Sequence, residues 1–474
     1  MLPATRKALV HSVPVNQLAD RLEKTFLTFV LCTFTFNSIP QLFAQVRVTN
    51  QTGVTRARDP GLRFSSPGAG APITGLTAGE LNMFTKAAPI FSEVDAVQNG
   101  LGPRFNLDSC SGCHAYPAVG GSSPFKNPQV ATAPTIAPGN TIPAFLSAYG
   151  PIREVRFVTN PDGTADGGVH DIFTITGRSD NPPGCSIEQP DFTDTSNMIF
   201  RIPTPIFGAG LIESIPDWVI RANLAADPAG QKSQNGVRGQ VNVGFIGGTV
   251  NTNPNDGGIT RFGWKAQNKS LTVFGGEAYN VEMGVTNEVF SNEREDDPDC
   301  AKNTLPESDS GFAVDSVTPS DVAAFRAFMR FLAPPLPSCT GKACSASIQN
   351  GHALASQIGC LTCHTETLTT GLSSTPALSQ KPVNLFSDLA VHHMGTGLAD
   401  GVTQGSAGPD EFRSAPLWGL GQRIFFLHDG RTKDLIQAIK AHQSSNSEAN
   451  QAVSNFQNLS PSQQQDLLNF LRSL

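Results

Sequence analysis

Two C-x-x-C-H pentapeptides, about half the chain apart, constrain this sequence more than any other feature. The first is Cys110-Ser-Gly-Cys113-His114 and the second is Cys360-Leu-Thr-Cys363-His364. Two thiols one helical turn apart can add to the two vinyl groups on one edge of a porphyrin, and the adjacent imidazole then lies under the iron as an axial ligand. Each pentapeptide therefore predicts a covalently attached c-type haem, held by His114 in one case and by His364 in the other.

Two other uses of paired cysteines fit less well. A thioredoxin-like redox pair would need a βαβ context, which this sequence does not suggest. A four-cysteine zinc site would leave both following histidines unexplained. Two complete motifs in one chain favour covalent haem over both alternatives.

Composition limits the remaining choices. The chain has 474 residues, 39% of them hydrophobic, and a formal net charge of −7, so it can bury a sizeable core and has no basic stretch for nucleic-acid binding. Its 45 glycines and 35 prolines are too many for a compact helical bundle. We expect a mainly α protein with extensive loops and some short strands, arranged as two cytochrome c-like haem domains with a large loop and strand insertion in the first.

The N-terminus has features of an export signal. Four basic residues precede an apolar run from Phe26 to Phe36, which is too short to span a bilayer, and Ala44 occupies a plausible cleavage position. Residues 1–45 are therefore predicted to be a leader, with no stable transmembrane segment and a periplasmic or secreted mature protein. The alternative is a buried amphipathic helix.

Helix signals divide the rest of the chain. Thr77 and Glu80 form a capping-box pattern that predicts a helix through Ala88. Thr318 and Pro319 are the expected cap and first residue of a helix that ends before Pro334-Pro335. This proline pair is the predicted boundary between domains at 46–335 and 336–474.

Further helices are expected in the second domain, and strands in the first. The helices are predicted at 347–358, at 433–441 and after the cap at Ser460. Between Tyr116 and Asn255 the glycine- and proline-rich sequence predicts loops around short strands, for example at 199–202 and 241–246.

Four further cysteines in the mature chain can form disulfides in an oxidising compartment. The close spacing of Cys339 and Cys344 suggests that these two pair with each other, which leaves Cys185 for Cys300. Other pairings stay open.

The sixth position of each iron decides between electron transfer and catalysis, because only an iron with an open side can meet peroxide or oxygen. No histidine lies between His114 and His170, so the first haem has no nearby histidine to close it. His442 shares a helical face with Leu435 and Ile439. A histidine on such a face is ordinarily a hydrogen-bonded core residue, but a haem must lie against an apolar face of this domain, which favours His442 as a ligand.

These features resemble a known family. The two motifs, followed by Glu411-Phe-Arg-Ser-Ala-Pro-Leu-Trp-Gly-Leu-Gly421 and Phe426-Leu-His428-Asp-Gly-Arg431, are similar to the di-haem oxidoreductase branch of the bacterial cytochrome c peroxidase and MauG superfamily, over about residues 75 to 474. The resemblance implies a peroxidatic N-terminal haem and a C-terminal haem through which electrons enter. It also places the second haem's remaining ligand at His442, where relatives have Met or Tyr, with Met394 as the rival ligand.

The resemblance extends to two candidate catalytic residues. Arg261-Phe-Gly-Trp264-Lys-Ala266 and Val281-Glu282-Met-Gly284 are similar to the family's segment that crosses between the haems and then presents a distal acid. Trp264 would then relay electrons, and Glu282 would move a proton on bound peroxide. A lone tryptophan is more often a core residue, and a lone glutamate more often solvated.

The sequence differs from the peroxidase pattern after His114, where the histidine that caps the resting peroxidatic haem has no counterpart, and the spacing from Trp264 to Glu282 is shorter. Both differences favour an always-open iron, as in MauG. We therefore expect reduction of hydrogen peroxide, or another small oxidant, with electrons from a cytochrome or cupredoxin. The alternatives are MauG-like or rubber-oxygenase-like oxidation of a protein or organic substrate, and a non-catalytic electron carrier. Relatives also suggest a calcium ion between the haems.

Overall fold

The computed structural model describes residues 54–64, 68–243, 245–246, 249–250, 258–295, 297–308 and 320–474, all of which belong to one compact unit. The predicted leader at 1–45 lies outside the described residues. Among the helices that are described, none is both long enough and apolar enough to cross a bilayer.

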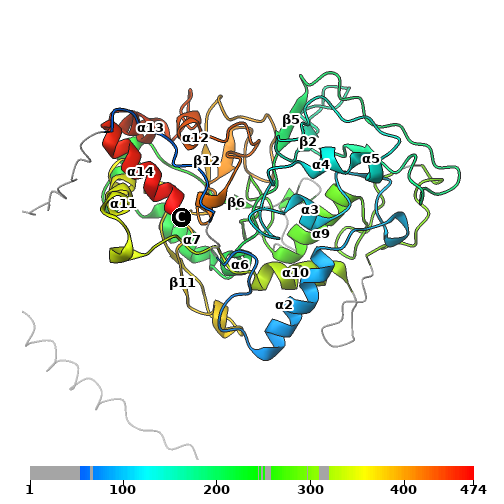
Figure 1. The fold of residues 1–474 in the computed structure, drawn as a ribbon, viewed down its shortest axis with the longest axis horizontal. Helices are drawn as coiled ribbons and strands as arrows, with labels where there is room; N and C mark the ends of the chain where they lie inside the picture. Colours follow the sequence, from blue (N-terminus) through cyan, green and yellow to red (C-terminus); the bar gives the residue numbers. More distant parts are fainter. Residues whose placement is uncertain are drawn as a thin grey trace, which may run out of the picture. The chain divides into compact units, whose positions relative to one another are not determined.

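Three helices form the frame around the first motif. They are α2 (Ala78–Phe91), α9 (Leu271–Met283) and α10 (Asp321–Phe331), and α10 packs against both of the others (Figure 1). Phe91 and Phe328 stack with ring centroids 4.7 Å apart where α2 meets α10. Such aromatic pairs add to the stability gained from apolar burial, so this contact fixes the two helices against each other.

The helix starts follow local capping chemistry. The Thr77–Glu80 capping box is present as predicted, and α2 continues three residues past the predicted end at Ala88. The prediction for α10 was wrong in its cap: Ser320 caps the helix by accepting the N–H of Ala323, and Thr318 and Pro319 lie outside the described residues.

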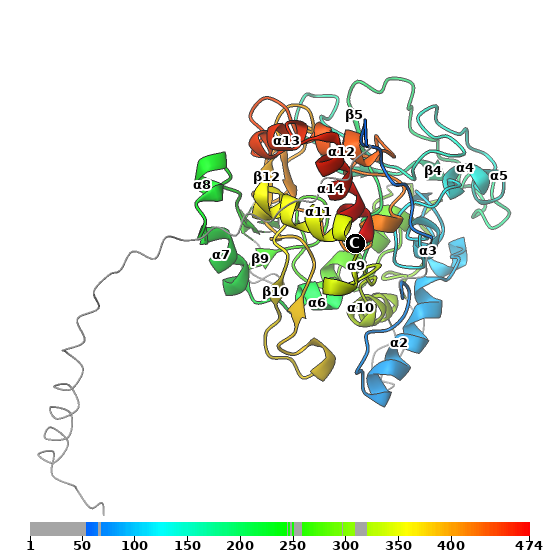
Figure 2. The same cartoon turned by 60° about the vertical axis from the view of Figure 1, so that its left-hand side comes forward.

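Three helices of the second half lie close to where the sequence places them: α11 (Ala346–Gln357), α12 (Leu435–Ala441) and α14 (Pro461–Ser473). A fourth helix, α13 (Asn450–Gln457), was not predicted. α11 packs directly against α14 (Figure 2). A Cβ atom at Gly351 would lie 2.0 Å from the Asp466 carbonyl oxygen, so only glycine allows this approach.

The remaining helices are short. They are α3 (Cys110–Cys113), α4 (Pro128–Ala131), α5 (Ala133–Ile136), α6 (Ala209–Glu213), α7 (Asp217–Ala225) and α8 (Gln231–Asn235), with 3₁₀ turns η2 (Val97–Asn99), η3 (Gly341–Ala343), η4 (Cys360–Thr362), η5 (Pro376–Leu378) and η6 (Leu420–Gln422). Several of them lie between residues 116 and 255, where only loops and strands were predicted. That prediction was incomplete because helices of one or two turns leave little periodicity in a sequence.

The strands in the described residues are short, and each pairing between them is antiparallel. They are β1 (Arg104–Phe105), β2 (Glu154–Phe157), β3 (Val169–His170), β4 (Phe173–Thr174), β5 (Met198–Arg201), β6 (Asn242–Val243), β7 (Phe245–Ile246), β8 (Thr249–Val250), β9 (Ile259–Thr260), β10 (Leu368–Thr369), β11 (Pro382–Val383), β12 (Val391–His393) and β13 (Glu411–Arg413). The described sheets are β3-β2-β5 and the pairs β1-β4, β6-β9, β7-β8, β10-β11 and β12-β13. The strands predicted at 199–202 and 241–246 are confirmed in position.

The four structural cysteines pair as the sequence suggested. Cys185 bonds to Cys300, and Cys339 bonds to Cys344. Helices with short sheets and much irregular chain agree with the predicted fold class. The division into domains at residue 335 stays a prediction, and buried ion pairs such as Arg201–Asp400 join the two sides of that boundary.

Candidate active site

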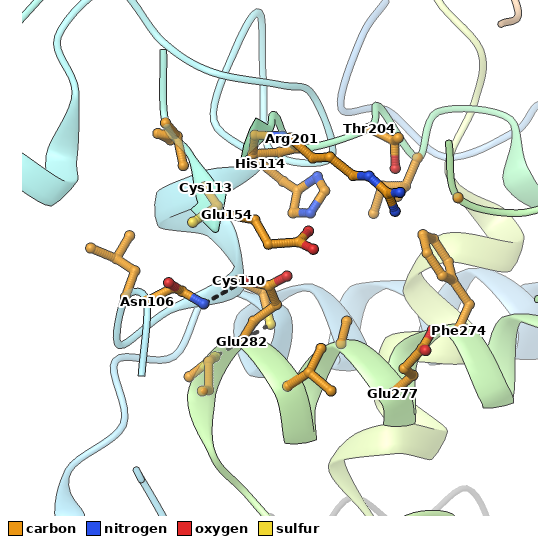
Figure 3. Close-up of a pocket in the computed structure, with 18 of the residues that line it drawn as sticks. Asn106, Cys110, Cys113, His114, Glu154, Arg201, Thr204, Phe274, Glu277 and Glu282 are labelled. Atoms are coloured by element: carbon orange, nitrogen blue, oxygen red, sulfur yellow. Dashed lines mark hydrogen bonds between the residues drawn. The ribbon is translucent and has the colours of Figure 1, made fainter. Parts of the chain in front are cut away.

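The first C-x-x-C-H motif opens onto a cavity. α3 is a single turn that carries Cys110 and Cys113, both outside disulfides, and His114 follows it directly. Figure 3 shows both cysteines and His114 around the same pocket. Burial raises the pKa of both thiols, so they are uncharged at neutral pH. One helical turn presents the two sulfur atoms as attachment to one porphyrin edge requires.

This first cavity has the lining of a cofactor site. It holds about 1130 Å³ of space outside the protein atoms, including its open mouth. Phe91, Phe325 and Met329 supply apolar walls from α2 and α10, while polar groups come from α9 and β2. Cofactor sites are mostly apolar with a few placed polar groups. A porphyrin attached through the free thiols therefore fits the residues present.

The His114 ring is oriented by the chain that follows it. Its Nδ1 lies 3.0 Å from the carbonyl oxygen of Gly121, and because a carbonyl only accepts, Nδ1 carries the proton. Burial lowers the pKa of His114, against the opposing effect of backbone carbonyls. The neutral Nε2 is then left with a free lone pair, the state that an axial ligand needs.

Glu282 reaches the first cavity from the last turn of α9. Asn106 donates from Nδ2 to Glu282 Oε2 at 3.1 Å, and also to Asp171 Oδ1 at 3.0 Å. Burial raises the pKa of Glu282 well above its usual range, and the charges of Glu154 and Asp171 raise it further. The protonated form of Glu282 is therefore favoured inside the cavity.

A second glutamate, which the sequence analysis missed, faces Glu282. Glu154 on β2 shares a hydrogen bond with the Glu282 carboxyl group, and Arg156 forms an ion pair with Glu154 (Figure 3 labels both glutamates). A carboxyl–carboxylate hydrogen bond needs one proton between two groups. The sequence does contain a signal for this site: charged and apolar residues alternate from Glu154 to Phe157, as in a strand with Glu154 and Arg156 on the same face.

The second C-x-x-C-H motif opens onto a larger cavity. Cys360 and Cys363 lie at η4, both outside disulfides, and line this second cavity together with His364. The cavity holds about 1430 Å³ of space outside the protein atoms, including its open mouth. Aliphatic and aromatic side chains, together with Met394, make up more than half of its lining. It fits a second porphyrin for the same reasons as the first.

Two histidines with the same orienting contact line the second cavity. Nδ1 of His364 lies 3.0 Å from the Phe386 carbonyl oxygen, and Nδ1 of His442 lies 2.8 Å from that of Ala438. Burial, and next the charge of His442, lowers the pKa of His364 to about 4; burial also lowers the pKa of His442. Both therefore present a neutral Nε2. His442 caps the C-terminus of α12 rather than lying within it.

Met394, the rival ligand, also lines the second cavity. It packs at the edge of a small cluster that contains Trp264 and Phe412. The structure thus brings both candidate ligands to the same cavity. Of the two, His442 has a hydrogen bond that orients a ring nitrogen as a donor to metal.

Trp264 lines both cavities. It is 8% exposed, and its Nε1 donates to the carbonyl oxygen of Ile202 at 2.8 Å. Its own carbonyl accepts the backbone N–H of Arg413 at 2.9 Å. The indole is therefore a buried core residue that also contributes to the lining of both candidate haem sites.

The calcium ion that relatives suggest stays a prediction. Within the described part of the chain, no group of three or more His, Cys, Asp or Glu side chains is placed to hold a metal ion.

Similarity to known proteins supports the same family. The family described as "Di-haem oxidoreductase, putative peroxidase" matches residues 152–474, so the match starts after the first C-x-x-C-H motif and later than the resemblance at 75–474 had suggested. No curated protein matches the chain.

Two solved structures are similar at low levels. Hydrazine synthase of Kuenenia stuttgartiensis, pressurised with xenon, has 15% identity and a TM-score of 0.24, with 62% of this chain and 97% of that chain covered. A MauG-like protein associated with microbial copper homeostasis has 16% identity and a TM-score of 0.26, with 62% and 92% covered. The family match spans more than half of the sequence, and the chain therefore belongs to the di-haem oxidoreductase, putative peroxidase family of enzymes.

Proposed function

We propose that this chain is an exported di-haem c-type oxidoreductase that reduces hydrogen peroxide at the first cavity with electrons that enter through the second. The observation that carries the proposal is the asymmetry of the two cavities. The first contains the Glu282 carboxyl group, whose pKa is raised by burial, and a single histidine among its described lining residues, whereas four histidines line the second, namely His364, His392, His428 and His442. An open iron beside an acid suits peroxide chemistry.

Covalent haem c would be held by the residues that line each cavity. Cys110 and Cys113 would attach the first haem and His114 would bind its iron; the second would be attached by Cys360 and Cys363. When bound, the first haem would supply the iron for peroxide and the second would pass on electrons from the donor protein. The disulfides support export, because such bonds persist in oxidising compartments.

The carboxyl groups of Glu282 and Glu154 can donate and accept the protons that peroxide reduction requires. Reduction of hydrogen peroxide consumes two electrons and two protons and forms two water molecules. Glu282 donates its carboxyl proton to the departing oxygen, which leaves as water, while Glu154, held by Arg156, accepts the proton of the other oxygen. Glu154 then returns that proton, solvent supplies a second proton that completes the other water molecule, and solvent reprotonates Glu282, so two protons are consumed in all. Asn106 keeps the Glu282 carboxyl group in place through the 3.1 Å hydrogen bond.

Electron delivery would use the second cavity and Trp264. His364 and His442 would saturate the second iron, with Met394 as the alternative to His442, and a saturated iron transfers electrons without binding substrate. Trp264 would relay electrons because it lines both cavities. A small cytochrome or cupredoxin is the proposed donor.

Two measurements test the proposal. The pyridine haemochrome assay should give two haems per chain, and one haem per chain would refute it. The wild-type protein should also reduce peroxide with reduced donor, and a Glu282→Gln variant with both haems should lose most of that activity.

Oxidation of a protein or organic substrate is the second candidate, and the same Trp264 contact favours it, since a relay can also carry oxidising equivalents away from the first cavity. A stable two-haem high-valent spectrum after addition of peroxide would favour this alternative. A pure electron carrier needs two protein ligands on each iron, and His114 is the single histidine among the described residues of the first cavity.

A further inference from the structure

Two arginines lie between the two cavities. Arg413, at the end of β13, and Arg423, directly after η6, both line the second cavity. Both also line a smaller cavity of about 500 Å³, which shares Trp264 with each of the larger ones. We call Arg413 and Arg423 the arginine pair.

Neither guanidinium of the arginine pair has an acidic partner among the described residues. Arg413 is 9% exposed and donates from Nε to the carbonyl oxygen of Gly263 at 3.0 Å. Arg423 is half-buried, and no hydrogen bond of its side chain is found with a described residue. Burial lowers the pKa of each to about 10, and the charge of Arg423 contributes to the shift at Arg413. Both are still charged at neutral pH.

Two buried arginines elsewhere in this fold, Arg201 and Arg472, are neutralised by carboxylates. Arg201 pairs with Asp400 at 2.6 Å, and Arg472 pairs with Asp59 at 2.7 Å. Two unpaired cations side by side in a buried place are costly unless an anion compensates them. The arginine pair therefore indicates an anionic ligand at this place.

We propose that the arginine pair is a carboxylate subsite that binds the propionate groups of the haem in the second cavity. This inference rests on the proposed function, because it needs a porphyrin there. The cysteines hold one edge of the porphyrin, and the propionates leave another edge of the same ring. Arginine matches a carboxylate with a planar fork of N–H donors. The same cavity is lined by Cys360, Cys363, the two histidines that would bind the iron, and the arginine pair.

The arginine pair would also raise the reduction potential of that haem. Positive charge close to an iron favours the reduced state, which carries one positive charge fewer. Trp264 lies beside the pair, and its carbonyl accepts the Arg413 N–H at 2.9 Å. The pair would therefore act on the donor side of the proposed electron path.

The test uses spectroelectrochemical titration of the holoprotein. Arg413→Gln and Arg423→Gln should each change the oxidised-to-reduced equilibrium of the low-spin haem about tenfold towards the oxidised state, which is about 59 mV for one electron. The matched control is Arg431→Gln, which removes the same charge from an exposed arginine paired with Asp429. Equal potentials in the control and both cavity variants would overturn the proposal.

The haem count of each sample distinguishes failure of the proposed function from failure of the subsite. Fewer than two haems per chain in the wild-type protein refutes the proposed function, and with it the subsite. If the glutamine variants lose haem, resonance Raman spectra of the wild-type protein and of Arg423→Lys test whether the arginine pair binds the propionates. Propionate bending bands should shift in D₂O and in the lysine variant. If the propionate bands shift neither in D₂O nor in Arg423→Lys, the subsite proposal is wrong, and the arginine pair binds a free anion from solvent instead.

Discussion

Replacement of Glu282 by glutamine removes the proposed acid and keeps its shape. In the wild-type protein, Asn106 Nδ2 donates to Glu282 Oε2 at 3.1 Å. A glutamine at this position can still accept that hydrogen bond and can donate one to Glu154. Only proton transfer is lost. Positioned acid–base groups contribute about 10²–10⁴-fold to rates, so kcat/KM for peroxide should fall by that factor, or about 3–5 kcal/mol in activation free energy.

The pH profile gives a second readout of the same change. Burial raises the pKa of Glu282, and the acid works only in its protonated form. The wild-type rate should therefore decline as the pH rises through that raised pKa, and this alkaline decline should be absent from Glu282→Gln.

Stopped-flow peroxide reduction with a pre-reduced protein is the assay, and Glu277→Gln is the matched control. Glu277 is a second carboxyl group on α9 that lines the first cavity and has a raised pKa, chiefly through burial, but its hydrogen bond goes to Asn268. It should lose less than tenfold. A loss below tenfold in Glu282→Gln, or an unchanged alkaline decline, would refute the assigned role.

Three further outcomes follow from the same contacts. His442→Ala should abolish the low-spin signal of the second haem in electron paramagnetic resonance while Met394→Leu preserves it; the reverse pattern would assign Met394 as the ligand. Trp264→Phe should slow electron transfer between the haems at least tenfold with haem content unchanged, and an unaltered rate in flash-reduction kinetics would exclude the relay. Asp400→Asn should destabilise folding by about 3–5 kcal/mol, because it leaves two buried cations without their carboxylate; Asp400 is 1% exposed and lies 2.6 Å from Arg201 and 3.1 Å from Lys265. Urea unfolding measures this, and a loss under 1 kcal/mol would contradict it.

Local chemistry explains what could be read from the sequence. The C-x-x-C-H motifs, the capping boxes at Thr77 and Ser460 and the apolar face of α10 each depend on residues a few positions apart. The disulfide pairing followed from one short spacing and elimination.

Contacts between distant segments could not be read in this way. Glu154 meets Glu282 only because β2 packs near the end of α9, and Asn106 is 176 residues from the carboxyl group that it holds. α9 itself was not predicted: Gly275 and Gly276 lie in its middle, and glycine has a low helix propensity. In the fold, a Cβ at Gly276 would lie 3.0 Å from Asn287 Oδ1, so packing explains a residue that propensity disfavours.

The coordination of the two irons tests the central claim most directly. Electron paramagnetic resonance of the oxidised wild-type holoprotein should show one high-spin and one low-spin ferric haem in equal amounts. Two low-spin signals, with both irons closed by protein ligands, would contradict the account, since peroxide would then have no iron to reach.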